Sequence, residues 1–408
     1  MIVYCERRLM PGTSADPKSP WADLWPLDPA VDYLNHGSFG ACPKAILEKQ
    51  SELRARLERE PMDFFVRELP GLFAEARAAL AGFVGADGDH LAFVPNATAG
   101  VNAVVRSLAF EPGDELLTTD HAYAACRKTL DYAASRTGAR VVAAQVPFPL
   151  SGVDEVVSAV LSRVTSRTRL AMLDHVTSPT ALIFPIERLV GELSARGVDT
   201  LVDGAHALGM IPLDLSRLGA AYYTANAHKW LCAPKGAAFL HVRRDRQKGL
   251  HPVSISHGYA RGEARFKDEF DWTGTADPTA ALCVPDCIAY LGGLVPGRWP
   301  ALMEANRALA LKARAAICEA LGVASPAPES MLGAMASVPL PISGPTTPAQ
   351  SLGREALADW MRARGVEPWF YDWPAGRGKL VRVSAQLYNT EGQFVRLAGL
   401  LAEALREA

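Results

Sequence analysis

The stretch TLVDGAHALG (200–209) holds an apolar run that ends in an aspartate, and AAYYTANAHKW (220–230) holds a second apolar run followed by a lysine. Each is typical of a short buried strand followed by a polar turn. Parallel strands end at a common edge of their sheet, where ligands bind in open α/β folds. Asp203 and Lys229 are therefore candidates for one site. On spacing alone, a buried or rim ion pair between them is the slightly favoured alternative.

Five more apolar runs flank these two and alternate with helix-like stretches. The seven expected strands begin at residues 91, 115, 140, 170, 200, 220 and 237, and the expected helices between them span 99–109, 122–136, 153–163 and 187–196. This alternation is the pattern of βα units. We predict an α/β fold whose large domain holds a mainly parallel seven-stranded sheet flanked by helices.

Outside this region, strand-like and helix-like segments no longer alternate regularly. Helices are expected near 43–60, 70–84, 279–292, 300–321 and 354–364, with further segments MLGAMASVPLPI (331–342) and KLVRVSAQLYNT (379–390). The last part therefore resembles a small α+β domain. The predicted organisation is an N-terminal arm at 1–30, a large domain at 31–280 and a small domain at 281–408.

Composition excludes several classes of protein. Of 408 residues, 49% are hydrophobic and 21% charged, which is typical of a globular protein. The formal charge of -2 gives no field that attracts nucleic acid or anionic lipid. The longest uncharged stretch, 330–353, is broken by prolines, the N-terminus lacks the apolar run of a secretory signal, and the seven cysteines are scattered. We expect a cytoplasmic protein with reduced thiols and no nucleic-acid or membrane partner.

The residue spacings and motifs do not indicate a metal site or a nucleotide site. Cys283 and Cys287 are four apart on an expected helix, but no second Cys/His pair at metal-site spacing accompanies them, so no metal is expected. The chain has neither a G-x-G-x-x-G nor a P-loop motif.

Two other turns follow expected strands. PNATAGVN (95–102) opens a helix near Thr98, where free N–H groups suit a phosphate, although taken by itself this pattern favours a simple Asn or Thr N-cap. TTDHAYAA (118–125) places His121 and Tyr123 near the same edge, as a stacking ring or as a packed aromatic and a surface histidine. A phosphate turn, an aromatic ring, an aspartate and a lysine together meet the needs of pyridoxal 5′-phosphate.

The motifs NATAGVN, DHAY, DHVTSPT, VDGAHALG, NAHKW and FDWTGTADP occur in that order between residues 96 and 278. In this order the chain resembles the class V (fold type I) pyridoxal-phosphate-dependent aminotransferase superfamily, and its isopenicillin N epimerase-like branch in particular. YLNHGSFGACP (33–43) supports the branch, and the resemblance runs from Asp28 to the C-terminus. It implies the fold type I transferase architecture and pyridoxal 5′-phosphate as cofactor.

The resemblance also implies a role for each matching residue. Lys229 would carry the cofactor as a Schiff base and act as the base at the substrate α-carbon, with Asp203 at the ring nitrogen and His206 at the ring 3-hydroxyl. The cofactor phosphate would be bound by four further residues, Thr98, Ala99, Asn226 and His228. Tyr123 best fits the stacking ring, and His121 is the alternative.

Other matches concern the substrate and a second subunit. Arg382 would bind the substrate α-carboxylate, with Asn35, His36 and Ser178 on the same side of the site. Gly274 and Thr275 match a segment that reaches the phosphate of the neighbouring subunit, which implies a homodimer with shared active sites.

Two features depart from the desulfurases of this class. Residues 365–381 lack the nucleophilic cysteine of a persulfide relay, and Ser178 replaces an asparagine. Four aromatic residues of that segment either line an apolar substrate pocket or pack the small domain: Trp369, Phe370, Tyr371 and Trp373.

The predicted function is that of an enzyme that removes the α-proton of an amino acid. Epimerisation or racemisation is the first interpretation, β-elimination by a C–S lyase the second and transamination the third, because all three use the same residues around the cofactor. A non-catalytic binding module agrees least with the complete set of Asp203, His206, Lys229 and Arg382.

Overall fold

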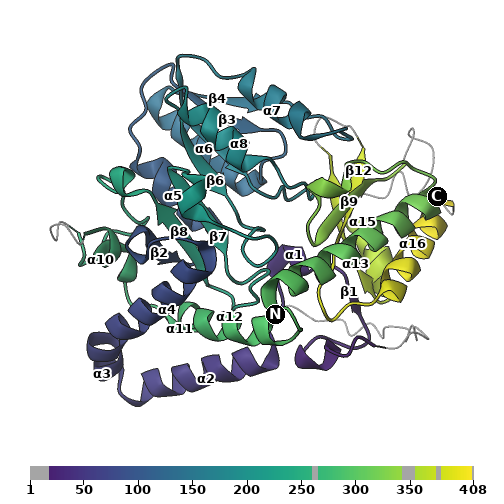
Figure 1. Cartoon of the computed structure of the whole chain (residues 1–408), viewed down its shortest axis with the longest axis horizontal. Coiled ribbons are helices and arrows are strands. Elements are labelled where there is room, and N and C mark those ends of the chain that lie inside the picture. The colour runs from purple at the N-terminus through teal and green to yellow at the C-terminus, as the bar shows by residue number, and fades with distance from the viewer. Residues whose placement is uncertain (1–17, 260–264, 342–353, 374–377, 407–408) are drawn as a thin grey trace, which may run out of the picture.

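The centre of the molecule is a seven-stranded sheet (Figure 1), seen in a computed structural model that describes residues 18–259, 265–341, 354–373 and 378–406. In spatial order its strands are β2 (Leu91–Val94), β8 (Ala238–Val242), β7 (Tyr222–Asn226), β6 (Asp199–Asp203), β5 (Thr168–Asp174), β3 (Glu115–Thr119) and β4 (Arg140–Ala144). Six strands run in one direction, and β8 is antiparallel to both of its neighbours. The predicted α/β fold and its seven strands are confirmed.

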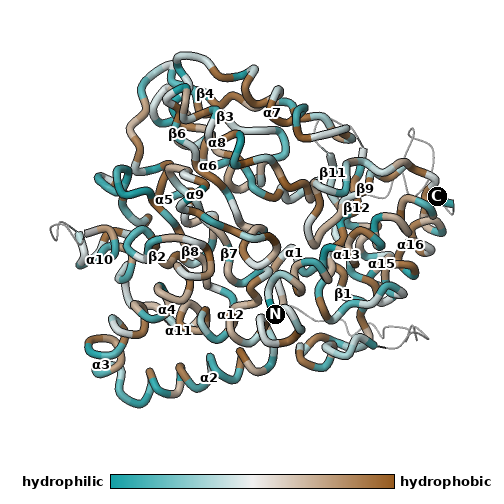
Figure 2. The backbone as a smooth tube through the Cα atoms, viewed as in Figure 1, coloured by the Kyte–Doolittle hydropathy of each residue, from teal (hydrophilic) through white to brown (hydrophobic). Residues whose placement is uncertain are grey.

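Helices cover both faces of this sheet. On one face α5 (Ala97–Ser107), α6 (Ala124–Thr137) and α10 (Arg265–Asp271) share one hydrophobic core. On the other face α7 (Val153–Leu161) and α8 (Ile186–Ser194) pack into a second core. The buried side chains of α8 are Ile186, Leu189, Val190 and Leu193, the spacing of one helix face. Figure 2 shows hydrophobic residues running through the central strands between these layers. A short helix, α9 (Leu215–Leu218), follows β6.

The C-terminal part is a smaller α+β unit, as expected. Its antiparallel sheet has the order β11 (Trp369–Asp372), β12 (Lys379–Ser384) and β9 (Met335–Pro339), and α13 (Arg298–Leu321), α15 (Arg354–Ala363) and α16 (Glu391–Arg406) accompany it. The expected helix at 279–292 is divided into α11 (Thr279–Leu282) and α12 (Val284–Gly293), with a proline in the first turn of α12, where a missing N–H costs little. The helix α16 is absent from the expected elements.

The N-terminal part contains one short strand and several helices, and it contacts the C-terminal unit. It holds β1 (Asp32–Tyr33), α1 (His36–Phe39), α2 (Lys44–Arg59), α3 (Pro61–Asp63) and α4 (Leu69–Val84), and five residues between α3 and α4 form a π-helix. The strand β1 pairs in parallel with β10 (Val366–Glu367), so residues before the large sheet lie beside the C-terminal unit. Residues 1–17 of the expected arm and the Pro-rich segment 342–353 lie outside the described residues. The domain limits at residues 30 and 280 stay a prediction.

Short 3-10 turns complete the described elements, at Ala22–Leu24, Gly88–His90, Arg244–Arg246 and Glu329–Met331. Within the described ranges no single helix has the length and hydropathy to cross a membrane, while one pair bent by 72°, Thr279–Gly293 with Arg298–Leu321, passes on length and composition alone.

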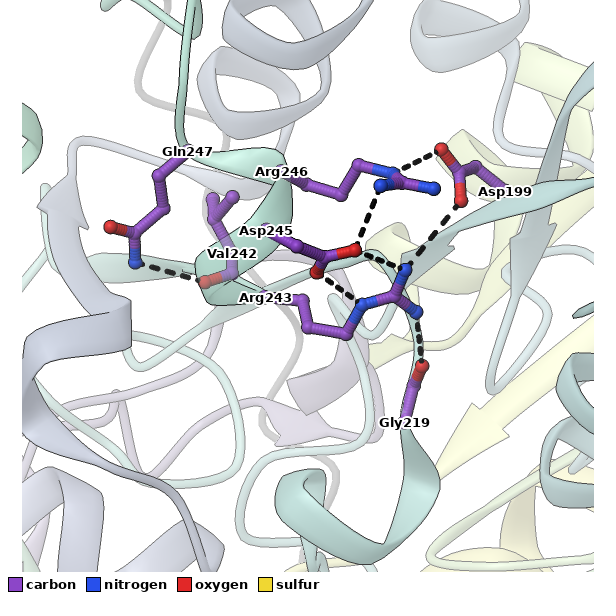
Figure 3. A network of polar contacts seen from close by, with 7 residues as sticks. All are labelled: Asp199, Gly219, Val242, Arg243, Asp245, Arg246 and Gln247. Atoms are coloured by element: carbon purple, nitrogen blue, oxygen red, sulfur yellow. Dashed lines mark hydrogen bonds and ion pairs between the residues drawn. The ribbon is translucent and has the colours of Figure 1, made fainter.

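The two edges of the large sheet differ in chemistry. At the edge where β6 begins, Asp199 pairs with Arg246 at 2.6 Å, and Asp245 pairs with both Arg243 and Arg246 (Figure 3). Arg243 also donates to the carbonyl of Gly219. The opposite charges of these partly exposed residues compensate one another, and each ion pair contributes little to the free energy of unfolding. The opposite edge, where the parallel strands end, carries the functional residues.

Candidate active site

Polar turns that follow five strands meet at one cavity of about 420 Å³ at the carboxyl edge of the sheet. Eight residues expected in a site line it: Thr98, Tyr123, Ser178, Asp203, His206, Asn226, His228 and Lys229. Four residues that were not expected line it as well: Ser38, Phe39, Asp174 and Lys235. The parallel strands bring these turns together because their ends share one edge.

Lys229 lies in the turn after β7, and its Nζ atom is 3.1 Å from Nε2 of His206. Burial of the amine, with the positive charge of Arg382 as a second cause, lowers the pKa of Lys229 to about 7. Burial and the charge of Lys229 hold the pKa of His206 well below its usual range, so this imidazole is neutral. An amine with this pKa is partly deprotonated at neutral pH, which suits attack on a carbonyl carbon.

Asp203 ends β6 and is buried at the floor of the cavity. Its Oδ2 accepts a hydrogen bond from Sγ of Cys126 at 3.1 Å, and its Oδ1 accepts one from the backbone N–H of Ala205 at 3.0 Å. Burial raises the pKa of this carboxyl. In the described part of the chain no salt bridge joins Asp203 to Lys229, which disfavours the simple ion pair as the reason for their presence.

The turn at Asn96 is an N-cap that also borders the cavity. Oδ1 of Asn96 accepts from the N–H of Ala99, and Oδ1 of Asn226 accepts from the N–H of Ala97, each at 2.8 Å. The Ala99 amide thus takes part in the N-cap, and its expected phosphate contact stays a prediction. Thr98 remains on the cavity wall at the positive end of α5.

Two basic residues stand near this turn. Nδ1 of His228 is 3.0 Å from the carbonyl of Ala237, which it bonds as a donor, and burial lowers its pKa to about 4. Lys235 was not expected; its Nζ donates to the carbonyl of Gly40 at 3.1 Å. Its signal in the sequence is a second lysine next to a glycine in the turn between β7 and β8.

The structure separates the two candidates for the stacking ring. Tyr123 lines the cavity and is 44% exposed. His121 is fully buried, with its ring nitrogens bonded to Thr180 Oγ1 and the carbonyl of Val146, and its ring lies edge-on to Trp373. His121 therefore serves packing away from the cavity.

Asp174 is the main cavity residue that was not predicted from the sequence. It ends β5, is buried, and lies opposite Asp203 in the β5–β6 pairing. Burial, with the charge of Asp203 as a second cause, raises its pKa well above the usual range. The signal was present, because the expected strand LAMLD ends in an aspartate as TLVD does.

Arg382 lies in β12 of the small sheet and is buried with neutral partners. Nη1 donates to the carbonyl and hydroxyl of Ser178 and to the hydroxyl of Tyr371, and Nη2 donates to Ser38 and Asn35, at distances between 2.8 and 3.3 Å. Its Nε has no partner, and no carboxylate forms an ion pair with it among the described residues. A buried guanidinium without a countercharge is a site for an anion.

Asn35 thus orients Arg382, whereas His36 has another place. His36 is buried, with Nε2 3.0 Å from the carbonyl of Lys229 and Nδ1 2.9 Å from the hydroxyl of Tyr388. It does not line the cavity. Packing directs this ring to the backbone of the Lys229 turn, and the expected substrate contact of His36 stays a prediction.

Gly274 and Thr275 lie outside the cavity lining, in an exposed segment between α10 and α11. Gly274 has a φ of +126°, a conformation that other residues rarely adopt.

The chain is similar in sequence to known proteins. A family model described as aminotransferase class-V matches residues 42–276. Isopenicillin N epimerase of Streptomyces clavuligerus is 37% identical over 92% of this chain and 95% of that protein. A probable chloroplastic L-cysteine desulfhydrase of Arabidopsis thaliana is 30% identical over 93% of this chain and 84% of that protein.

A solved structure shows the same fold. A mutant of C-DES with glycine covalently linked to its PLP cofactor has a TM-score of 0.74 and 21% identity to this chain, over 91% of this chain and 96% of that one. The similarity spans the large sheet and the C-terminal unit, and confirms the expected architecture.

Proposed function

Because the chain belongs to the aminotransferase class-V family, we propose that it is a pyridoxal 5′-phosphate-dependent enzyme that epimerises an amino acid or a compound built from one. The observation that carries the proposal is the buried amine of Lys229, which lies 3.1 Å from His206 and shares one cavity with His206 and Asp203. Catalysis of this class needs an amine for the cofactor aldehyde and an acid at the ring nitrogen. Both are present at the ends of neighbouring strands.

The residues of the cavity fit the cofactor. Nδ1 of His206 and Oδ1 of Asp174 are buried polar atoms without partners in the described chain, as a missing polar ligand would leave them. The N-terminus of α5 with Thr98 suits a phosphate, and the exposed face of Tyr123 suits a flat ring. When bound, pyridoxal phosphate supplies an electron sink for negative charge at the substrate α-carbon.

The residues of this chain divide the remaining tasks. Lys229 holds the cofactor and then, once freed, takes the α-proton with its Nζ. Asp203 would keep a proton at the ring nitrogen, and Arg382 would bind the substrate α-carboxylate, because no carboxylate of the described residues pairs with this buried guanidinium. Ser178 and Asn35 fix the guanidinium from two sides. A proton returned to the opposite face of the α-carbon completes an epimerisation.

The relatives support epimerisation first. The two isopenicillin N epimerases are 37% and 38% identical to this chain, against 30% for the Arabidopsis desulfhydrase. A C–S lyase is the second candidate, favoured by that desulfhydrase and by the fold shared with the cystine C-S lyase C-DES.

The test of the reaction uses purified protein with pyridoxal phosphate, amino acids, short peptides and cysteine conjugates in heavy water. Deuterated product of inverted configuration, found by chiral mass spectrometry without keto acid, supports epimerisation. Pyruvate with ammonia and a released sulfur compound supports the lyase. Lys229→Ala should abolish either product, while Lys312→Ala, a change at an exposed residue paired with Glu391, should leave both unchanged.

We also propose a homodimer with shared sites. Gly274 and Thr275 are exposed and do not line the cavity of their own chain, as expected of residues that serve a partner. Phe39, at the rim of the cavity, is 67% exposed, which suits contact with a second subunit.

A further inference from the structure

Two carboxyl groups lie side by side at the floor of the cavity. Asp174 and Asp203 end the neighbouring parallel strands β5 and β6, and they are opposite one another in the strand register. Each side chain is 3% exposed, and each lines the cavity. The motif analysis assigned a role to Asp203 alone.

The hydrogen bonds of the two groups differ. Both oxygens of Asp203 already accept bonds, from Cys126 and from Ala205. Oδ2 of Asp174 accepts from the backbone N–H of Tyr123 at 3.2 Å, but its Oδ1 is buried without a partner in the described structure. A buried carboxyl oxygen without a partner is costly unless it is protonated or a ligand completes it.

The surrounding charges decide the protonation state. The groups that act on Asp174 are Asp203 on β6, the N–H of Tyr123 before α6, and Lys229 after β7, while Cys126 of α6 faces both carboxyls. Burial raises the pKa of both carboxyls, and the charge of Asp203 raises the pKa of Asp174 further. Two neighbouring buried carboxyl groups do not readily ionise together, so one of the pair keeps a proton.

We propose that Asp174 is a second carboxyl ligand for the pyridine nitrogen of the cofactor, so that Asp174 and Asp203 together bind and protonate the ring. The O–H bond of the carboxyl that carries the proton would break as an N–H bond forms on the ring nitrogen, with no change of oxidation state and no co-reactant. Both carboxylates would then lie beside the protonated ring nitrogen, whose positive charge offsets the repulsion between them. This inference rests on the cofactor of the proposed function and is independent of the reaction that follows.

A purely structural role is the alternative. Asp174 would then serve only to hold the Tyr123 backbone through Oδ2. Asp174→Asn keeps an oxygen that can accept this N–H but removes the charge, whereas Asp174→Ala removes both. The pair of variants therefore separates the two roles.

The experiment uses the cofactor-free protein and 4′-deoxypyridoxine 5′-phosphate, which lacks the aldehyde and so forms no bond with Lys229. Its ultraviolet absorption reports whether the ring nitrogen is protonated, and it is recorded against pH for each variant. If Asp174 neighbours the ring, Asp174→Asn should lower the pKa of the bound ring nitrogen by about 1 to 3 units. Two results would overturn the proposal. The first is an equal pKa of the bound ring nitrogen in Asp174→Asn and in the unsubstituted protein. The second is failure of the unsubstituted protein to bind the probe.

Asp120→Asn is the matched control. Asp120 follows β3 at the same edge and accepts from the N–H of Val146, but it does not line the cavity. This change should move the pKa of the ring nitrogen much less than Asp174→Asn does. Circular dichroism and thermal unfolding establish that each variant is folded.

A second measurement needs no variant. Calorimetry in two buffers of different ionisation enthalpy counts the protons taken up when the probe binds, at a pH where the free ring nitrogen is unprotonated. The paired carboxyls should supply the proton, so uptake from buffer is near zero; uptake of a whole proton would contradict the pair. If the probe binds with almost no proton uptake but the protein turns over no substrate, only the proposed reaction is contradicted.

Discussion

At the scale of single residues, Lys229 has its low pKa because its amine is buried and because the positive charge of Arg382 disfavours the ammonium form. The neutral amine is the form that attacks an aldehyde. We therefore predict that attachment of pyridoxal phosphate to the cofactor-free protein becomes faster as pH rises, with a midpoint near the pKa of about 7. Borohydride trapping followed by mass spectrometry of the peptide that contains Lys229 measures this rate.

A control variant tests the sign of the effect. Arg382→Gln removes a positive charge that disfavours the ammonium form, so the pKa of Lys229 and the midpoint should both move to higher pH. An unchanged midpoint in this variant would show that burial alone sets the pKa.

Arg382 itself should control substrate binding rather than cofactor binding. Its bonds from Nη1 and Nη2 go to neutral oxygens, and the carboxylate of the substrate would be its only charged partner. Truncating one partner of a buried charge pair costs about 2 to 5 kcal/mol, so Arg382→Ala should lower kcat/KM about 30-fold or more. The absorption band of bound cofactor should persist, and its loss in this variant would contradict the assignment.

At the scale of elements, the N-terminus of α5 joins stability to function. The cap bond from Ala99 to Asn96 fixes the first turn, and Asn226, at the end of β7, fixes the same turn through the N–H of Ala97. Asn96→Ala should lower the free energy of unfolding by about 1 kcal/mol, and it should weaken phosphate binding because the turn loosens. Urea unfolding and titration with pyridoxal phosphate measure the two effects.

Asn96→Asp is the matched control for this cap. A carboxylate also accepts the N–H of Ala99, so stability should be retained, while its negative charge beside the phosphate should still weaken cofactor binding. Equal stability of Asn96→Ala and the parent protein would show that the cap contributes nothing.

The elements also show which patterns were readable. The seven strands were predictable because each is an apolar run bounded by turn residues. The helix α16 was equally readable, since its buried residues Phe394, Leu397, Ala398 and Leu401 follow one helix face, yet it was not expected. The strand β11 was missed because its aromatic residues suggested a pocket or packing before they suggested a strand.

At the scale of the whole molecule, the proposed dimer predicts complementation. Lys229→Ala and Thr275→Arg should each be inactive, the first in its own site and the second in that of its partner. In a mixed dimer one site carries both changes and the other carries neither, so co-expression should recover activity that neither parent shows. If the mixed dimer forms and stays inactive, each site is built from one chain.

Co-expression with differently tagged chains and sequential affinity purification isolates the mixed dimer for this test. Analytical ultracentrifugation gives its mass. A monomer at micromolar concentration would contradict the dimer itself rather than the sharing of sites.

The sequence by itself determined the α/β class, the strand order along the chain, and the polar residues that follow strands, such as Asp203 and Lys229. It could do so because hydrophobic period and turn residues are local signals. The tertiary structure alone decided that Arg382 meets Ser178 and Asn35 from distant parts of the chain, that His36 supports Lys229, and that Asp174 retains an unpartnered oxygen. These contacts depend on packing between remote segments, and the pKa values depend on burial, which no local pattern encodes.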